Sequence, residues 1–259
     1  MNCAICDSNT DFAFTQKVLE KYDANYRVCN TCGFLSAHNP IWLEEAYQNS
    51  ITINDTGLLS RNIEFHKKLI VLIDKFFDSD DFYLDYAGGY GILTRLMRDA
   101  GFRFLHYDPL TENLFAKDFT FDAEVHKIRL ITCFECFEHL TDPILELKKM
   151  LRISQNIFFS TEIKSSLIPS LDWDYYAFQH GQHISFHSSE SLQLLASKFD
   201  LYFYSIGSFH LFTKMKINNS QFIKLYKRAG RRKSMFSSRA LYEHVSKKRR
   251  FSKLKSGAQ

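Results

Sequence analysis

Four of the six cysteines form two CxxC pairs, Cys3 with Cys6 and Cys29 with Cys32, and 22 residues separate the pairs. A CxxC turn directs two thiolates toward one point, and two such turns complete the tetrahedral set of sulfurs that structural zinc prefers. Because four thiolates leave no open coordination position, we expect a Zn²⁺ ion that supports folding only. Disulfides are the alternative, but they need an oxidising compartment that nothing else in the sequence indicates.

The stretch YLDYAGGYGILTRL (83–96) places Gly88, Gly89 and Gly91 between an expected strand and an expected helix. In a parallel sheet, ligands bind beyond the carboxyl ends of the strands, and a turn without side chains lets a ligand approach the backbone. Near the end of this strand, Asp85 is expected to turn its carboxylate into the cleft. A threonine stands where a dinucleotide fingerprint needs its third glycine, and the chain holds no P-loop motif. A tight strand-to-helix turn without a ligand is the alternative.

A second acidic residue, Asp108, ends the next expected strand in FRFLHYDP, 23 residues after Asp85. A carboxylate at this position can accept hydrogen bonds from both hydroxyls of a ribose. The alternative is a helix cap or a turn aspartate before Pro109. After the following strand, the stretch ITCFECFEH carries Glu135, Glu138 and His139 at the same edge of the sheet. Its two cysteines have no second pair and are read as small apolar core residues.

Three histidines, His180, His183 and His187, crowd into the stretch FQHGQHISFH. Histidine suits general-base catalysis near neutral pH, so each is a candidate base. A catalytic metal is a rival interpretation, although no acidic residue joins the histidines within this stretch. A purely structural role is the alternative for each of them. Three tyrosines offer a hydroxyl donor and a flat face to a sugar or a sulfonium cation, or they pack in the core: Tyr47, Tyr175 and Tyr176.

The elements that must position these residues alternate along the chain. Helical spacing covers 58–77, and a short helix is expected in WLEEAYQN, before the loop SITINDTG. The expected strands are FYLDYA, RFLHYDP, IRLITCFE and NIFFSTE, and the expected helices between and after them are GILTRLMRDAGF, DPILELKKMLRI and SESLQLLASKF. The pattern predicts an α/β fold with a mostly parallel sheet, helices on both faces and an antiparallel edge formed by two closing runs.

We therefore expect four segments: a zinc ribbon (1–36), a helical lead-in (37–77), a Rossmann-like domain (78–213) and a basic C-terminal extension (214–259). The extension holds 15 Lys/Arg and one acidic residue, whereas the rest of the chain is acidic. A nucleic-acid or anionic-membrane contact and a solvated helix are both open for this extension. The chain has no apolar run of membrane-spanning length and no signal-peptide pattern, so a cytoplasmic protein is expected.

Several of these motifs resemble one enzyme family. The pattern D-x-A-G-G-x-G resembles the first motif of class I S-adenosylmethionine-dependent methyltransferases, with Ala87 in place of the first glycine. The stretch FECFEHLTDP (134–143) is similar to another of their motifs. The segments 44–62, 158–162 and 172–192, together with the CxxC pairs, resemble a subset that begins with a four-cysteine zinc module. This subset serves bacterial surface-polysaccharide and deoxysugar pathways, and the resemblance covers residues 1–213.

The resemblance implies S-adenosylmethionine as cofactor, and it implies roles for particular residues. His183 matches the base of related sugar methyltransferases, with Gln182 in place of their usual glutamate, and His180 and Glu135 are further catalytic candidates. The cofactor-binding candidates are Asp85, Ala87, Gly88, Gly89, Gly91, Asp108, Pro109, Asp118, Phe119 and Glu135. The acceptor-binding candidates are Tyr47, Arg61, Asn62, Tyr175, Tyr176 and His187.

The expected reaction is O-methylation of a hydroxyl on a nucleotide-linked sugar for capsule or surface-polysaccharide synthesis. Methylation of a phosphate or phosphoramidate oxygen on a nucleotide-activated capsule modifier is a second possibility. An RNA or DNA methyltransferase, for which no amide-methylating or Pro-Cys motif is present, and a non-enzymatic zinc- and cofactor-binding protein are the others. The sequence leaves the oligomeric state open.

Overall fold

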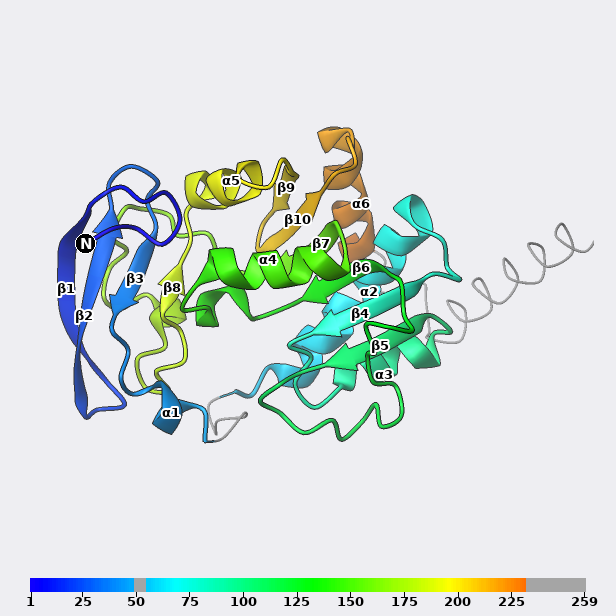
Figure 1. The fold of residues 1–259 in the computed structure, drawn as a ribbon, viewed down its shortest axis with the longest axis horizontal. Helices are drawn as coiled ribbons and strands as arrows, with labels where there is room; N and C mark the ends of the chain where they lie inside the picture. Colours follow the sequence, from blue (N-terminus) through cyan, green and yellow to red (C-terminus); the bar gives the residue numbers. More distant parts are fainter. Residues whose placement is uncertain (49–54, 232–259) are drawn as a thin grey trace, which may run out of the picture. The chain divides into compact units, whose positions relative to one another are not determined.

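The computed structural model describes residues 1–48 and 55–231, and its chain divides into two compact units. The first unit is Met1–Asn54 with Cys133–Lys216, and the second is Asp55–Thr132 with Ile217–Gln259. Most of the expected loop SITINDTG and the end of the basic extension lie outside the described residues. Figure 1 shows the elements of both units, labelled in chain order.

The first unit contains an antiparallel sheet at the N-terminal end of the chain, with strand order β1-β2-β3-β8. Its strands are β1 (Thr10–Val18), β2 (Tyr22–Cys29), β3 (Leu35–His38) and β8 (Ser185–Phe186). Helix α1 (Leu43–Ala46) is shorter than the stretch WLEEAYQN. An aromatic core lies on this sheet, and its largest members are Tyr26, Trp42, Tyr176 and Phe186.

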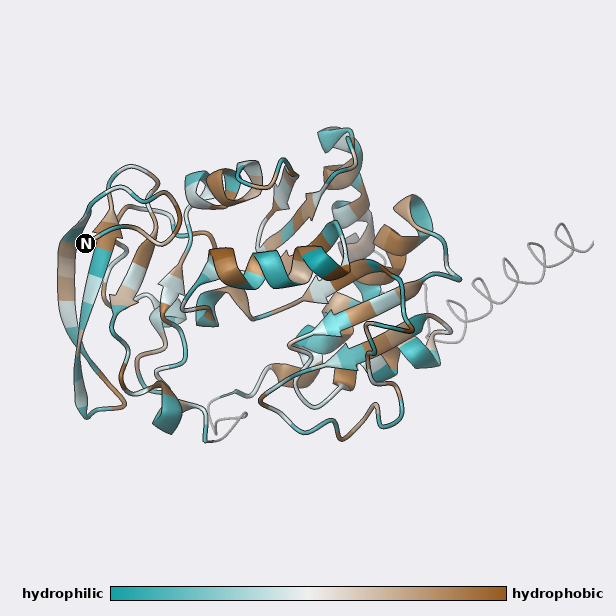
Figure 2. Ribbon diagram, in the orientation of Figure 1, coloured by the Kyte–Doolittle hydropathy of each residue, from teal (hydrophilic) through white to brown (hydrophobic). Residues whose placement is uncertain are grey.

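The same unit continues with β7 (Asn156–Ser160) and the hairpin of β9 (Tyr202–Ile206) and β10 (Phe209–Thr213). Strand β10 pairs antiparallel with both β7 and β9 and has every residue buried. The helices are η1 (Phe137–His139), α4 (Pro143–Ile153), η2 (Asp174–Tyr176) and α5 (Ser189–Ser197). Figure 2 shows brown and teal alternating along α4, as expected where a helix buries one face.

The second unit carries the parallel strands β4 (Phe82–Tyr86), β5 (Arg103–Tyr107) and β6 (Ile128–Cys133). Strand β4 pairs in parallel with β5 and with β6. The helices of this unit are α2 (Leu58–Phe76), α3 (Ile92–Asp99) and α6 (Asn219–Arg231). The strand order of the larger sheet is β5-β4-β6-β7-β10-β9, which confirms the predicted α/β fold class with its antiparallel edge.

The first part of the basic extension forms helix α6. Phe222 and Ala229 of this helix are buried, and the ammonium of Lys68 on α2 lies 3.8 Å from the ring centre of Tyr226. The predicted division at residues 36, 77 and 213 stays a prediction. None of the helices within residues 1–48 and 55–231 has the length and the apolar composition of a membrane-spanning segment.

Gly181 holds the chain between η2 and β8 in a conformation that only glycine fits. Its φ is +68°, and an added Cβ would lie 2.7 Å from Val18 Cγ1 and 3.0 Å from Trp42 Cδ1. The indole of Trp42 donates a hydrogen bond to the Gly181 carbonyl at 2.7 Å. A side chain at this position must therefore displace the core of the N-terminal sheet.

We expect Gly181→Ala to lower the free energy of unfolding by about 2–4 kcal/mol, from overpacking and left-handed strain together. Gly89→Ala is the matched control, because Gly89 also has a positive φ (+55°) but an added Cβ there meets nothing within 4 Å. Urea unfolding of both variants measures the difference. Equal losses in the two variants would show that the contact with Trp42 and Val18 is unimportant.

Candidate functional site

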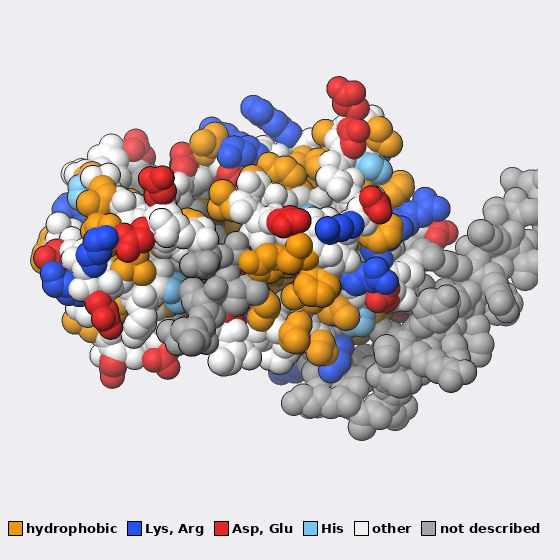
Figure 3. Space-filling model, turned by 90° about the horizontal axis from the view of Figure 1, so that it is seen from below, with side chains coloured by type: hydrophobic (Ala, Val, Ile, Leu, Met, Phe, Trp, Pro, Cys, Tyr) orange, Lys and Arg blue, Asp and Glu red, His pale blue; other side chains and the backbone are white. Residues whose placement is uncertain are grey.

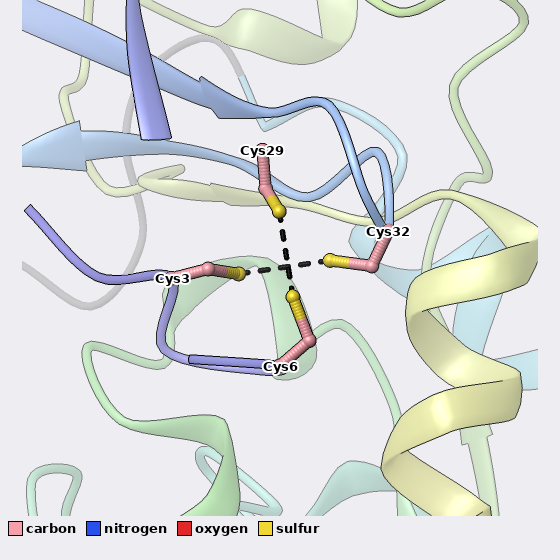
Figure 4. Close-up of side chains that lie close together, drawn as sticks. All are labelled: Cys3, Cys6, Cys29 and Cys32. Atoms are coloured by element: carbon pink, nitrogen blue, oxygen red, sulfur yellow. Dashed lines mark hydrogen bonds between the residues drawn. The ribbon is translucent and has the colours of Figure 1, made fainter. Parts of the chain in front are cut away.

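The four paired cysteines converge at one end of the N-terminal sheet (Figure 4). The Sγ atoms of Cys3 and Cys32 are 3.6 Å apart, those of Cys6 and Cys29 are 3.4 Å apart, and all four lie within 4.8 Å of one another. Tetrahedral zinc with Zn–S bonds of about 2.3 Å separates its sulfurs by roughly 3.8 Å. The four thiols therefore fit a metal ion.

The surroundings of Cys3 favour its thiolate. The Cys32 thiol, assisted by nearby backbone N–H groups, lowers the pKa of Cys3 to about 5 against the effect of burial. One of these groups is the amide of Ile5, which donates to Cys3 Sγ at 3.4 Å. The other two cysteines, Cys133 and Cys136, are buried outside this cluster, as expected for small apolar residues.

The glycine turn after β4 is left-handed at three positions, Ala87 (φ 56°), Gly89 (φ 55°) and Gly91 (φ 85°). A Cβ at Gly88 would lie 2.7 Å from Asp85 Oδ2, and one at Gly91 would lie 2.6 Å from the side-chain oxygen of a neighbouring loop residue, so packing requires both glycines. Nothing lies within 4 Å of a Cβ built on Gly89. The backbone of Gly89 is therefore open to a ligand, which fits the predicted cofactor site.

Asp85 lies beneath this turn and is buried. Its carboxylate accepts hydrogen bonds from the hydroxyls of Thr94 and Thr132, each at 3.0 Å. Burial raises the pKa of Asp85 to about 6, against the opposing effect of His106 and these hydroxyls. This corrects the expectation that its carboxylate faces the cleft: the side chain fastens the turn to α3 and β6.

Asp108 and His106 fix the position of Gly89 from the end of β5. Asp108 Oδ2 accepts a hydrogen bond from the Gly89 amide at 2.8 Å, and Oδ1 accepts from the amides of Leu110 and Thr111 at 2.8 and 2.9 Å. The Nε2 atom of His106 lies 2.8 Å from the Gly89 carbonyl, which can only accept, so Nε2 carries the proton. Both Asp108 oxygens already accept backbone hydrogen bonds, so a ribose hydroxyl would have to share an oxygen with an amide. Ribose binding by Asp108 stays a prediction.

The loop from Pro109 to Phe119 borders the turn through backbone contacts. The Tyr90 carbonyl accepts hydrogen bonds from the amides of Leu114 and Phe115. Asp118 is exposed with φ 69°, and the guanidinium carbon of Arg98 lies 3.9 Å from the ring centre of Phe119. Hydrogen bonds thus join the glycine turn to Asp108 and to this loop. Sequence reasoning missed His106, whose only signal was its position in the strand before Asp108.

Hydrophobic side chains reach the surface on the face that Figure 3 shows. The exposed large apolar residues of the second unit include three of this loop, with exposed fractions between 45% and 71%: Leu110, Leu114 and Phe115. They lie close in sequence to the predicted adenine-binding residues Asp118 and Phe119.

A second polar neighbourhood lies in the first unit, after β6. Glu135 has φ 50°, a left-handed conformation that is uncommon for glutamate. Its amide donates to Ser160 Oγ at 2.8 Å, and the Ser160 hydroxyl donates back to its carboxylate at 2.6 Å. This double contact holds Glu135 at the carboxyl end of β7, in the kind of strained position that is common at functional sites.

Glu138, His139 and His183 each present one side-chain atom to a common space, and these atoms lie within 4.8 Å of one another. Burial, followed by the charge of Glu135, raises the pKa of Glu138 to about 8. Burial lowers the pKa of His139 to about 4, so its ring is neutral. Sequence reasoning placed Glu138 and His139 at the sheet edge but did not include them among the site residues.

Both imidazoles in this cluster have the same tautomer. Nδ1 of His139 lies 3.0 Å from the Gln182 carbonyl, and Nδ1 of His183 lies 2.7 Å from the Tyr175 carbonyl. Because a carbonyl only accepts, each Nδ1 carries the proton, so Nε2 is the nitrogen that bears the lone pair in a neutral imidazole. Each histidine can therefore act as a base or a metal ligand through Nε2.

The segment 181–185 carries His183 to this place by bonding to distant parts of the first unit. The amide of Ile184 donates to the Glu138 carbonyl at 2.8 Å, and the Ser185 hydroxyl donates to the Leu140 carbonyl at 2.6 Å. The side-chain amide of Gln182 donates to the Ala46 carbonyl of α1 at 2.7 Å.

Three more predicted residues border the cluster. The rings of Tyr175 and His180 lie 4.7 and 5.1 Å from that of His183, and the ring of Tyr47 lies 6.2 Å from that of His139. The Tyr175 hydroxyl accepts a hydrogen bond from the Glu162 amide and lies 3.1 Å from Thr161 Oγ1. The structure therefore brings Tyr47, Tyr175, His180 and His183 together.

The other four predicted acceptor residues make different contacts, each within its own unit. Tyr176 is 1% exposed and stacks on Phe178 in the core, and His187 is 0% exposed and lies against Phe34. This corrects their prediction as acceptor-lining residues, because packing encloses both. The other two lie in α2 of the second unit, where Arg61 pairs with Asp55 and the Asn62 amide donates to a helix carbonyl.

Because the carboxylate of Asp85 is buried, we expect the stability of the wild type to change with pH relative to an Asp85→Asn variant. Its folded pKa of about 6 lies above the unfolded value of about 3.9, so it stabilises the fold at low pH and this contribution is lost as the pH rises through 6. Asp85→Asn cannot lose a proton. Relative to this variant, the wild type should lose about 2 kcal/mol of stability between pH 4.5 and 7.

Urea unfolding across that pH range measures this difference. Asp99→Asn is the control, because Asp99 is an exposed carboxylate of the same unit. Parallel stability curves for the wild type and Asp85→Asn would contradict the assignment.

A family model described as "Methyltransferase domain" matches residues 60–206 of the chain. The search of curated proteins found no match to the chain. Among solved structures, an O-methyltransferase family 2 protein from Planctomyces limnophilus in complex with apigenin is 15% identical, with a TM-score of 0.42, and 66% of each chain is covered.

Two further structures are similar at this level. Magnesium protoporphyrin IX methyltransferase from Synechocystis with bound SAH is 10% identical, with a TM-score of 0.45, and the match covers 66% of this chain and 90% of that one. The plantazolicin methyltransferase in complex with SAH is 13% identical, with a TM-score of 0.46, covering 74% and 85%. These weak similarities say nothing about the acceptor.

The family match spans more than half of the chain and includes the glycine turn, Asp108 and the Glu138–His183 neighbourhood. The chain belongs to this methyltransferase domain family and is an S-adenosylmethionine-dependent methyltransferase.

Proposed function

We propose that this enzyme methylates a hydroxyl of a small polar acceptor, a nucleotide-linked sugar or a related precursor of a surface polysaccharide. The observation that carries the proposal is the tautomer of His183, whose Nδ1 donates to the Tyr175 carbonyl and whose Nε2 is the nitrogen left to take a proton. A hydroxyl needs such a base before it attacks a methyl group, and a base that is positioned in this way accelerates reactions by about 10²–10⁴-fold.

His183 is the proposed base. Its Nδ1–H donates to the Tyr175 carbonyl at 2.7 Å, which fixes the ring and its tautomer. When Nε2 takes the acceptor proton, the positive ring keeps this hydrogen bond, because a carbonyl accepts more strongly from a charged donor. The neighbouring rings of Tyr47, Tyr175 and His180 offer polar groups and flat faces that suit a sugar.

On the cofactor side, the open backbone at Gly89 and the carboxylate of Asp108 are the proposed contacts for the nucleoside. S-adenosylmethionine supplies a methyl group that its sulfonium already activates. The residues of this chain hold the donor and deprotonate the acceptor, and positioning alone can remove about 7–11 kcal/mol of barrier. Pro109, Asp118, Phe119 and Glu135 remain proposed cofactor residues, and Asp85 is proposed to support the cofactor turn from beneath. Arg61 and Asn62 remain proposed acceptor residues.

A methyl transfer to a phosphate or phosphoramidate oxygen is the second candidate. Such an oxygen is already anionic and needs no base, so its methylation would not depend on the His183 imidazole. The basic extension, whose first part is α6, favours anionic partners in general, including nucleic acids.

His183→Ala tests the proposed base. We expect at least a ~100-fold lower kcat with a nucleotide-sugar acceptor and unchanged affinity for S-adenosylhomocysteine by calorimetry. His38→Ala is the control, since His38 is an exposed histidine on β3 of the same unit. An unchanged kcat would remove His183 from this role, and methylation of RNA but of no nucleotide sugar would overturn the proposed acceptor class.

We also propose that the four-cysteine cluster holds a structural Zn²⁺ ion. Cys6→Ser should release about one equivalent of zinc and cost at least ~3 kcal/mol of stability, equivalent to a Tm about 6–12 °C lower for a chain of this size. Cys133→Ala removes a buried thiol outside the cluster and should keep the zinc. Metal analysis and thermal unfolding measure both, and full zinc retention by Cys6→Ser would contradict the site.

A further inference from the structure

Glu138 is a buried carboxylate without the partners that such a group normally has. The residue is 0% exposed, and neither carboxylate oxygen has a hydrogen-bond partner of normal geometry, although the hydroxyls of Tyr175 and Thr161 lie near enough to affect it. A buried polar group without partners is costly, and such a group in a native structure calls for an explanation such as an ion that binds there. A cation would satisfy both oxygens.

The two imidazoles beside Glu138 are arranged as metal ligands usually are. Histidines that bind metals almost always donate their other ring N–H to a carbonyl or carboxylate, which fixes the ring and its tautomer. His139 and His183 do this, toward the carbonyls of Gln182 and Tyr175. The rings stand at 78° with centres 4.9 Å apart, and one ligand atom from each of the three residues lies within 4.8 Å of the others.

From these observations we propose that Glu138, His139 and His183 form a second metal site, which takes a divalent first-row transition ion through one carboxylate and two Nε2 atoms. Two histidines and one carboxylate bind zinc in hydrolytic enzymes and iron(II) in oxygenases, and in both cases they leave coordination positions open. The site differs from the four-cysteine cluster, whose four thiolates close the coordination sphere. Soft sulfur and harder nitrogen–oxygen ligands also give different spectra with the same metal.

The open positions suggest what the metal does in this enzyme, and this part rests on the proposed function. An acceptor hydroxyl that binds the ion becomes more acidic, so the ion can replace a general base. The His183 Nε2 atom cannot hold a metal and take a proton at the same time. In a metal-loaded enzyme, His183 would be a ligand in place of the general base proposed above, and the proton of the acceptor hydroxyl would pass to solvent.

Cobalt titration of the full-length protein tests the site without an activity assay. With zinc first supplied at one equivalent to fill the cysteine cluster, the wild type should bind one further equivalent of Co²⁺. This ion should show weak visible d–d bands and no sulfur-to-cobalt charge-transfer band. Glu138→Gln and His139→Ala should each bind the second ion at least ~100-fold more weakly. Changing a residue that only orients a ligand already costs about 10–100-fold in metal affinity, and these two variants remove a ligand itself.

Glu162→Gln is the matched control, because Glu162 is an exposed carboxylate of the same unit and should leave the titration unchanged. Circular dichroism and retained zinc in the cysteine cluster show that each variant is folded. Absence of a second equivalent in the wild type overturns the proposal, and so does equal binding by Glu138→Gln and His139→Ala. Because the readout is bound cobalt, loss of the proposed methyl transfer with the second ion still bound counts against the methylation proposal alone.

Discussion

The hydrogen bonds of one short segment, 181–185, hold the proposed acceptor site together. Trp42 donates to the Gly181 carbonyl, and the Ile184 amide donates to the Glu138 carbonyl. The next residues join the N-terminal sheet as β8, where Ser185 and Phe186 pair with β3. The segment thereby connects the sheet that carries the cysteines with the polar loop after β6.

The acidic residues of the two units show how burial divides their roles. Asp85 and Asp108 are each held by hydrogen-bond donors, and both tie the glycine turn to its neighbours. Glu138 is more deeply buried than Asp108 and lacks donors of normal geometry. A carboxylate that accepts hydrogen bonds from the protein positions a loop, whereas a carboxylate without such donors is available to a ligand. This contrast makes Glu138 the strongest indication of chemistry in the first unit.

The left-handed turn residues show that the fold accepts strain at its proposed ligand sites. Ala87 adopts φ 56° where related motifs carry glycine, and Glu135 adopts φ 50° beside Ser160. A left-handed conformation costs an ordinary residue about 1–2 kcal/mol. Ala87 directly follows β4 and Glu135 comes two residues after the end of β6, where the chain must turn sharply to leave the sheet edge open.

The sequence by itself determined the local features: the α/β alternation, the CxxC pairs, the glycine turn and the family. These follow from periodicity and from short motifs, in which a few neighbouring residues carry the signal. Only the tertiary structure decided that Asp85 is buried, that Tyr176 and His187 belong to the core, and that His106 and Glu138 matter. Burial depends on contacts between distant segments, such as residue 138 with residue 184, and no local pattern records them.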